Sequence, residues 1–484
     1  MRRSIIATAA ILLLSVDTSG RAKTPGFDYV SPLPGSTMVS QLTNIILRPS
    51  REIPAQSIVD RASIRVTGTR SGEAAGTLIL SDDGTTLTFN PARAFAREET
   101  VTVEVRSRDG GWGERAGSLL RFSFNTTGYV GRARTVRDEP ASAVQAHDTF
   151  LSTRSAGLGL PADFPSVTVT HADNPSPGCL FLSNMTMGSG SANSPYIMIL
   201  DNSGAPVFYR STRDECTDFK VQPNGLITYM DSYLHCFLAL DSSYAVVDTF
   251  RCGNGYPTNW HELRILPDGH ALILGDDPQV IRMDSVVPGG YPSAVVQGIV
   301  IQELDRSKNV VFQWRTFDYF KITDATHEDL TASFIDYVHS NAIEPDTDGT
   351  LMLSSRHMDE ITKINRRTGD IVWRWGGKNN QFTFVNDSLG FRHQHAIRRL
   401  PNGNVTLFDN GDFRYPLLSR GVEYSLDEGT KKAVQVWQYR ENPDIYASAM
   451  GYVQRLPNGN TLVGWGRRTR RSPRSVLTAA SQWS

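Results

Sequence analysis

Short runs of alternating apolar and polar residues extend along most of this 484-residue chain. Turns rich in Gly, Pro, Asn and Asp separate them, and Val, Ile and Leu dominate the apolar positions. Runs of four to eight residues with this alternation are typical of β-strands that bury one face. The content of 40 glycines and 25 prolines fits a turn-rich chain. The pattern therefore predicts an all-β protein.

The first part of the chain forms a unit of its own in this pattern. About seven alternating runs fall between residues 27 and 127, among them SIRVTGT, TLTFNPA and TVTVEVRS. About seven short strands in about 100 residues predict an immunoglobulin-like β-sandwich. The unit, bounded at 26–127, resembles bacterial Ig-like modules through its DGTTLTFNP segment. Residues 128–165 have weak periodicity, and we interpret them as a linker.

Residues 166–484 contain an internal repeat. A turn that begins with proline and contains Asp or Asn and Gly recurs at Pro223, Pro267, Pro345, Pro401 and Pro457, with an apolar hairpin between successive turns. A repeat of about 40–60 residues with four strands per unit is the signature of a β-propeller. We count six units and predict a six-bladed propeller. We expect a strand from the start of this domain to complete the last blade.

The N-terminus has the pattern of an export signal. Two arginines precede an apolar run at residues 5–16, and small polar residues follow. This run is too short to span a bilayer, and we interpret residues 1–22 as a signal peptide. The protein is therefore expected to be periplasmic or secreted. No later segment is long and apolar enough to cross a membrane.

Cysteines and charge limit the partners. An exported chain with an even, clustered set of cysteines favours disulfides; the pairing is open among Cys179, Cys216, Cys236 and Cys252. Lys plus Arg total 49 and Asp plus Glu total 50, so charge does not indicate nucleic acid as a partner. The sequence leaves open whether the protein forms a homodimer.

The repeat also aligns candidate chemistry. The residues six positions before the turn prolines are Thr217, His261, His339, His395 and Gly451. Equivalent positions on the innermost strands of a propeller face one axial cavity, so three imidazoles are expected to meet there.

Two further polar residues belong to the same predicted site. Arg356 ends the inner hairpin that starts near His339, and its guanidinium fork suits a tetrahedral oxyanion. Asn341 follows His339 by two residues and is expected on the same strand face.

Three interpretations of this site compete. The histidines could simply bond backbone groups, or they could hold zinc or copper. Arg356 would repel a cation, and no carboxylate shares the aligned positions, so we predict no metal. The third interpretation is an anion-handling site with one neutral histidine as nucleophile. His393 is a rival for that nucleophile. We expect structural roles for the other histidines, His147, His171, His235, His270, His327 and His357.

The motifs HSNAIEP, SSRH, QHA and FDNG occur in this order across the repeat. In this respect residues 170–466 resemble the bacterial arylsulfate sulfotransferase family. The resemblance implies a six-bladed propeller behind a sandwich domain. It also implies transfer of a sulfuryl group from an aryl sulfate to a phenol. The implied mechanism is ping-pong through a sulfo-histidine and needs no cofactor.

The resemblance assigns roles residue by residue. It places the nucleophile at His395 and the H-x-N pair at His339 and Asn341. It places the SSRH arginine at Arg356, and His261 matches a histidine of an earlier unit. These four catalytic candidates and Asn341 as a substrate-binding residue repeat the set selected by the turn prolines. Met450 stands where the family has a threonine, so one donor to the sulfuryl group is expected to be missing.

Two other functions stay open at this point. A non-catalytic secreted propeller could bind partners or act as a scaffold while keeping the ring of histidines. A quinone-dependent dehydrogenase also uses a propeller, and TGDIVW at residues 368–373 mimics its tryptophan motif. The aligned histidines are foreign to that class.

Overall fold

The computed structural model describes residues 24, 26–107, 118–129, 150–151, 159–185, 194–468 and 477–480. These residues form an all-β protein, as predicted. They include one α-helix, α1 (Ala55–Arg61), and four short 3-10 helices, η1 (Met283–Ser285), η2 (Thr316–Asp318), η3 (Ile322–Asp324) and η4 (Arg356–Met358). None of the helices in this part of the chain has the length and apolar character needed to span a membrane. The predicted signal peptide lies outside the described residues.

The N-terminal region is a sandwich of two antiparallel sheets, ordered β1-β2-β6-β5 and β4-β3-β7-β8. Their inward-facing residues, such as Leu47, Leu87 and Val103, form one apolar core. Helix α1 was not predicted; it buries only Ala55 and Ile58, too few for a helical pattern to stand out. The strands are β1 (Phe27–Ser31), β2 (Ile45–Pro49), β3 (Ala62–Gly68), β4 (Gly72–Glu73), β5 (Gly76–Leu80), β6 (Leu87–Pro91), β7 (Thr100–Ser107) and β8 (Ser118–Asn125).

The rest of the chain forms successive antiparallel sheets. The first sheets are built from β9 (Phe150–Leu151), β10 (Leu180–Ser183), β11 (Tyr196–Leu200) and β12 (Pro206–Ser211); then β13 (Cys216–Val221), β14 (Ile227–Asp231), β15 (Cys236–Leu240) and β16 (Val246–Phe250); then β17 (Thr258–Ile265), β18 (Ala271–Ile281), β19 (Ala294–Leu304) and β20 (Val310–Arg315), with β21 (Phe334–Asp336) beside β19.

The later sheets follow the same plan. They comprise β22 (Ser340–Pro345), β23 (Leu351–Ser355), β24 (Glu360–Ile364) and β25 (Ile371–Gly376); then β27 (His395–Arg399), β28 (Val405–Asp409), β29 (Arg420–Asp427) and β30 (Lys432–Tyr439), with β26 (Thr383–Val385) outside; and last β32 (Tyr452–Arg455), β33 (Thr461–Gly464) and β35 (Leu477–Ala480), beside the pair β31 (Ala447–Ala449) and β34 (Arg467–Arg468).

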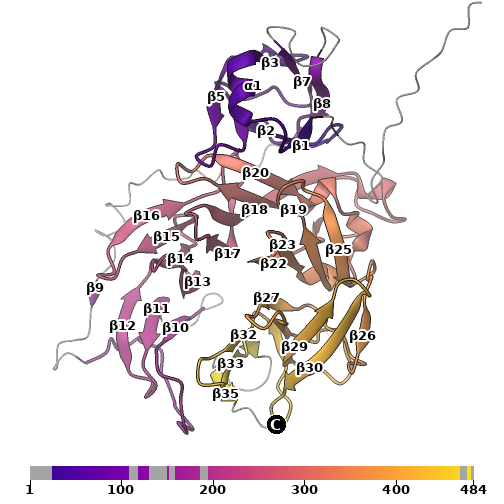
Figure 1. Ribbon diagram of the computed structural model, residues 1–484. Coiled ribbons are helices and arrows are strands. Elements are labelled where there is room, and N and C mark those ends of the chain that lie inside the picture. Colours follow the sequence, from indigo (N-terminus) through magenta and orange to yellow (C-terminus); the bar gives the residue numbers. More distant parts are fainter. Residues whose placement is uncertain are drawn as a thin grey trace, which may run out of the picture.

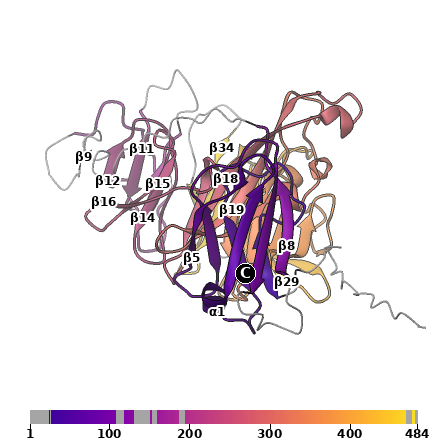
Figure 2. The same cartoon turned by 90° about the horizontal axis from the view of Figure 1, so that it is seen from above.

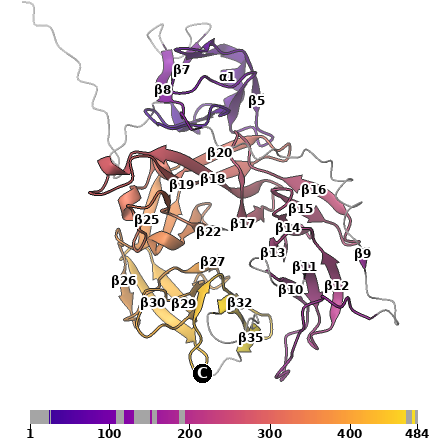
Figure 3. The ribbon, with the colours of Figure 1, turned by 180° about the vertical axis from the view of Figure 1, so that it is seen from behind.

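The sheets are arranged around a common centre (Figure 1), and the view from behind shows the same order (Figure 3). The strands β13, β17, β22, β27 and β32 lie innermost, and each contacts the next along the chain. Strand pairing stays within each sheet, and among the described residues no sheet closes into a ring. This arrangement places residues of different sheets side by side at the centre.

Two short strands differ from the expected chain path. Strand β35, in the last described segment, pairs with β33 and extends the last sheet. Strand β9, in the segment interpreted as a linker, pairs with β12 at the outer edge of the first sheet. The predicted completion of the last blade by a strand from the start of the domain is therefore replaced by pairing with the C-terminal segment.

The predicted disulfides are absent: no disulfide links the four cysteines, all of which the structure describes. Cys216 and Cys236 both pair with Asp231, so strand β14 lies between them. Two strand spacings separate their Cα atoms by about 9–10 Å, beyond the reach of a disulfide. The partly buried Cys252 donates from Sγ to the Leu274 carbonyl, and Cys179 is exposed.

The sandwich packs on strand β20 (Figure 1), and seen from above it lies in front of β18 and β19 (Figure 2). Buried Arg48 donates from Nη1 to the Arg366 carbonyl at 2.8 Å. His270 bridges the two regions: Nδ1 lies 2.6 Å from Glu303 Oε1, and Nε2 lies 2.7 Å from Asp82 Oδ1 in the sandwich. These carboxylates, Glu303 first, raise the pKa of His270 to about 9 despite its burial. The imidazolium is therefore part of the contact.

We expect His270→Gln to destabilise the protein by roughly 1.5–3 kcal/mol near pH 6, the usual value of a charged hydrogen bond. The folded-state pKa lies above the unfolded value of about 6.5. The stabilisation is therefore complete below pH 6.5 and disappears as the pH rises through about 9. Urea denaturation at pH 6 and pH 9.5 measures this. The two proteins should converge at the higher pH, and an equal gap at both pH values would contradict the assignment.

Candidate active site

The predicted site residues lie where the inner strands are irregular. Strands β13, β17, β22 and β27 each have a register shift near their start, between Ser340 and Ala342 in β22 and between His395 and Arg398 in β27. Bulges of this kind redirect side chains and are common beside active sites. The bulges therefore aim histidines from different sheets toward the same end of the centre.

The structure brings the predicted residues together. The ring centroids of His261 and His339 are 5.0 Å apart. His395 is buried at the start of β27, and the charge of Arg356 acts on the pKa values of both His261 and His395. Asn341 Nδ2 donates to the backbone carbonyl of Gln394, the neighbour of His395, at 2.8 Å.

His395 is held in one orientation by Asn410. The amide nitrogen of Asn410 donates to the carbonyls of Ala447 and Met450, both at 2.8 Å. The amide oxygen therefore faces His395, and it accepts from Nδ1–H at 2.7 Å. Burial and then Arg356 lower the pKa of His395 to about 3. The ring is thus neutral, with its lone pair at Nε2.

His261 is held in the same way by Asn259. The Asn259 amide nitrogen donates to Asp276 Oδ1 at 2.7 Å, so its oxygen accepts from His261 Nδ1–H at 2.7 Å. Burial lowers the pKa of His261 well below its usual value, and the neighbouring His339 lowers it further. His261 is therefore a second neutral imidazole.

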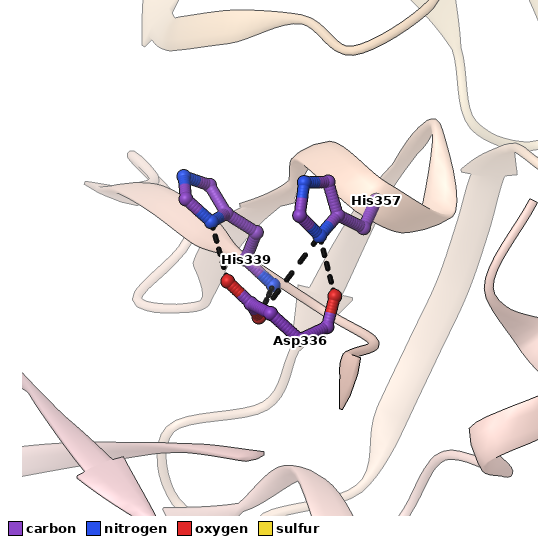
Figure 4. A group of neighbouring side chains, drawn as sticks. All are labelled: Asp336, His339 and His357. Atoms are coloured by element: carbon purple, nitrogen blue, oxygen red, sulfur yellow. Dashed lines mark hydrogen bonds and ion pairs between the residues drawn. The ribbon is translucent and has the colours of Figure 1, made fainter. Parts of the chain in front are cut away.

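His339 is held instead by a carboxylate. Its Nδ1 lies 2.6 Å from Asp336 Oδ2, and its backbone N–H donates to Asp336 Oδ1 at 3.1 Å. Figure 4 shows both bonds, together with His357, whose Nδ1 bonds the Asp336 carbonyl. Burial raises the pKa of Asp336, but the hydrogen bonds and charge of His339, together with the charge of His357, outweigh burial and lower that pKa.

Arg356 is anchored by two acceptors. Its Nη2 donates to Asp412 Oδ2 at 2.8 Å and to the Ser448 carbonyl at 3.0 Å. Its Nε is buried and has no partner among the described residues. An anchored guanidinium with an unused donor suits an anionic ligand.

Three further histidines, for which we predicted structural or rival roles, extend the contact between His261 and His339 into a row of rings. The histidine row comprises His261, His339, His357, His393, His327 and the neighbouring His395. His357 lies 4.6 Å from His339 between ring centroids, and His393 lies 5.4 Å from His357. His327 contacts His393 in turn, at 5.7 Å. We expected only a structural role for His357, but it lies in the 3-10 turn η4, beside Arg356 and in contact with His339. His327, between η3 and β21, carried no repeat signal.

His393 is less suited to be the nucleophile than the sequence allowed. Its Nδ1 lies 2.9 Å from Asp412 Oδ2, and Asp412 also accepts from Arg356 and from the Tyr446 hydroxyl. The left-handed backbone at His393, with φ of 52°, turns this residue out of the strand that His395 begins. Its buried Nε2 has no partner among the described residues.

One group in the described chain has the composition of a metal site. Nitrogen and oxygen atoms of Asp336, His339 and His357 lie within 4.8 Å of one another. These atoms already bond each other, and the Arg356 guanidinium contacts His357 Nε2. A fixed cation at the same imidazole disfavours a bound metal ion.

Aromatic side chains flank the row of histidines. Trp260 is 43% exposed and meets His261 edge to face at 5.7 Å. Phe413 is 59% exposed and stacks on His327 at 4.3 Å with an interplanar angle of 16°. Since one face of Phe413 is covered, its other face is available to a flat ligand.

Met450 meets His395 through its backbone. Its N–H donates to His395 Nε2 at 3.2 Å, with φ of 60° at Met450. At the position where the sequence predicted a missing side-chain donor, a main-chain donor therefore faces the His395 ring.

The comparisons with solved structures give weak likenesses. A protein of unknown function from Bacteroides caccae is 14% identical over 56% of this chain and 79% of that chain, with a TM-score of 0.36. A catalytically inactive virginiamycin B lyase from Staphylococcus aureus is 8% identical over 63% and 88%, with a TM-score of 0.33. The copper resistance protein PcoC from Escherichia coli is 13% identical over 21% and 100%, with a TM-score of 0.17. No curated protein matches the chain.

Family profiles give a clear result. The profile described as bacterial Ig-like domain matches residues 22–126, in agreement with the observed sandwich. The profile described as arylsulfotransferase matches residues 167–480. That match spans more than half of the chain and contains all the strands that carry the histidine row. The protein therefore belongs to the arylsulfotransferase family and is an aryl sulfotransferase.

Proposed function

We propose that the protein transfers a sulfuryl group from an aryl sulfate ester to a phenol by a ping-pong mechanism, through a sulfo-histidine at His395. The observation that carries this proposal is the bond between His395 and Asn410. It leaves a neutral ring with the lone pair at Nε2, which is what a nucleophile for sulfur requires. No other imidazole of the row is both so deeply buried and held by a neutral amide.

The first half-reaction forms the covalent intermediate. Nε2 of His395 bonds to sulfur as the bond between sulfur and the phenolic oxygen breaks, and the electron pair leaves with that oxygen. The ring becomes positively charged, and the Nδ1–H bond to Asn410 Oδ1 persists. In the second half-reaction the oxygen of the acceptor phenol takes the sulfuryl group from Nε2. The transition state is loose, so positioning and charge matter more than strong nucleophiles.

Three groups are suited to hold the sulfuryl oxygens. The buried Nε of Arg356 is an unused charged donor. The N–H of Met450 already points at His395 Nε2, where the sulfur would arrive. The amide of Asn341 uses one hydrogen on the Gln394 carbonyl and has a second one left. Donors fixed in advance stabilise developing negative charge without reorganisation.

The aromatic rings of the donor and the acceptor are proposed to bind at one shared position opposite His395. In-line transfer requires the leaving and attacking oxygens to lie opposite His395, so the donor and the acceptor use the same position in turn. The open face of Phe413 and the exposed ring of Trp260 are the flat apolar surfaces beside the row. This supports small aryl sulfates and phenols as substrates.

We further propose that the successive sheets form a six-bladed β-propeller. The radial order of the inner strands supports it, as do the contacts of Asn460, whose side chain donates from the last sheet to the Asn174 carbonyl before the first. The signal-like N-terminal sequence supports export to the periplasm or the medium. The oligomeric state is not assigned.

Incubation with excess 4-nitrophenyl sulfate without acceptor should add the mass of one SO3 group to the protein, because Nε2 of His395 keeps the sulfuryl group. His395→Ala should abolish the adduct and reduce turnover by on the order of 10³-fold or more, as loss of a covalent nucleophile does. Intact-mass spectrometry measures the adduct. His171→Ala, at an exposed histidine far from the row in sequence, is the control. An adduct that persists in His395→Ala would refute the assignment.

Phe413→Ala should raise KM for 4-nitrophenyl sulfate and for phenol by similar factors, up to about tenfold, since one aromatic contact contributes about 0.5–1.5 kcal/mol. Tyr415→Ala is a matched control on the same loop, because Tyr415 is 98% exposed. Steady-state kinetics with each substrate varied measures both constants. Equal effects of the two substitutions would argue against an aryl subsite at Phe413.

A further inference from the structure

Five imidazoles of the row share one feature, whereas His327 bonds Asp359 Oδ2 through Nε2. His261, His339, His357, His393 and His395 all bond an oxygen through Nδ1. Each therefore presents Nε2 away from its anchor. They differ in the oxygen at Nδ1, and that oxygen sets how readily the ring accepts a proton, because a carboxylate stabilises an imidazolium and an amide does so much less.

Most rings of the row are poor proton carriers by this criterion. Neutral amides hold His261 and His395. A backbone carbonyl holds His357, and burial lowers its pKa to about 3. Asp412 holds His393, but the same carboxylate oxygen already pairs with the Arg356 guanidinium.

His339 is the exception. Among the described residues, Asp336 makes ion-pair contacts only with histidines, so no arginine or lysine neutralises its charge. It bonds both Nδ1 and the backbone N–H of His339, which fixes the ring (Figure 4). The His339 side chain is 24% exposed, and its Nε2 has no hydrogen-bond partner in the described part of the chain. The ring also touches His261 within the row.

We propose that His339 carries the proton to and from the phenolic oxygen and that Asp336 is the positioning residue that enables it. This assignment rests on the proposed sulfuryl transfer and adds Asp336 to it. In the donor half-reaction, Nε2–H of the His339 imidazolium gives its proton to the phenolic oxygen as the bond to sulfur breaks. In the acceptor half-reaction, neutral Nε2 takes the proton of the phenol as its oxygen attacks sulfur. His339 thus returns to its starting state.

His261, the other catalytic candidate beside His339, is less suited to this acid–base role. The His261 imidazole bonds the neutral amide of Asn259, and its burial disfavours the positive charge that a general acid must carry. His261 is better suited to donate or accept a hydrogen bond as a neutral ring.

Asp336→Asn tests the proposal because the amide keeps the shape and removes the charge. The release of phenols from aryl sulfates is followed in a rapid-mixing instrument. 4-Nitrophenyl sulfate releases a stable anion and needs little acid; 4-methylphenyl sulfate releases a basic one. We expect the first half-reaction to slow by about 10²-fold with 4-methylphenyl sulfate, the usual size of a general-acid effect, and by only a few-fold with 4-nitrophenyl sulfate.

His339→Gln should show the same dependence on the leaving group, which covers the case in which Asp336→Asn fails to fold. Glu328→Gln is the matched control: its carboxylate lies 3.6 Å from His357 Nε2 and does not bond His339. Equal slowing with both sulfates, or none, would overturn the acid–base assignment while sulfo-enzyme still forms. A wild-type protein that forms no sulfo-enzyme would overturn the proposed function and this assignment together.

Discussion

One buried carboxylate, that of Glu262, joins the inner strands on which the site is built. From β17 it accepts from Lys220 Nζ of β13 at 2.6 Å and from Arg398 Nη2 of β27 at 2.8 Å. It also accepts from the backbone N–H of Ile343 in β22 at 3.1 Å. Burial would raise its pKa, but Arg398 and Lys220 outweigh burial and lower that pKa to about 2. Removing one partner of such a cluster leaves a charge uncompensated, so the strands are held in one register.

This anchoring explains how the site histidines can lie where the inner strands are least regular. Glu262 follows His261 directly in the chain, so the residue that fixes β17 to its neighbours adjoins a residue of the row. His339 lies directly before the bulge at the start of β22, and His395 is the residue at which the bulge of β27 begins. A bulge costs hydrogen bonds, and the charged cluster lies one or two residues further along the same strands. Irregular and rigid parts therefore alternate along each inner strand.

The repeat pattern was enough to find His261, His339 and His395, because a turn proline marks equivalent positions in every sheet. It was not enough to find Asp336, which lies before the inner strand and reaches His339 by a local turn. Nor could it place His357, since strand alternation ends at the 3-10 turn after Ser355. The prediction of disulfides was wrong because sequence spacing does not reveal that strand β14 lies between Cys216 and Cys236. Local periodicity thus predicts which strand a residue belongs to, but not its neighbours across irregular turns.

The partners at Nδ1 explain how one site can contain imidazoles of opposite character. A nucleophile for sulfur must be neutral, whereas a group that protonates a leaving phenolate must first hold a proton. Burial alone would make every ring of the row neutral, and shared carboxylates alone would charge them all. The chain separates the two states by residue type: Asn259 and Asn410 hold rings that stay uncharged, and Asp336 holds one that can be charged. Because Arg356 is tied to Asp412 and not to Asp336, its positive charge does not cancel that difference. The pairing of cations with carboxylates around the row is therefore as important to the chemistry as the histidines themselves.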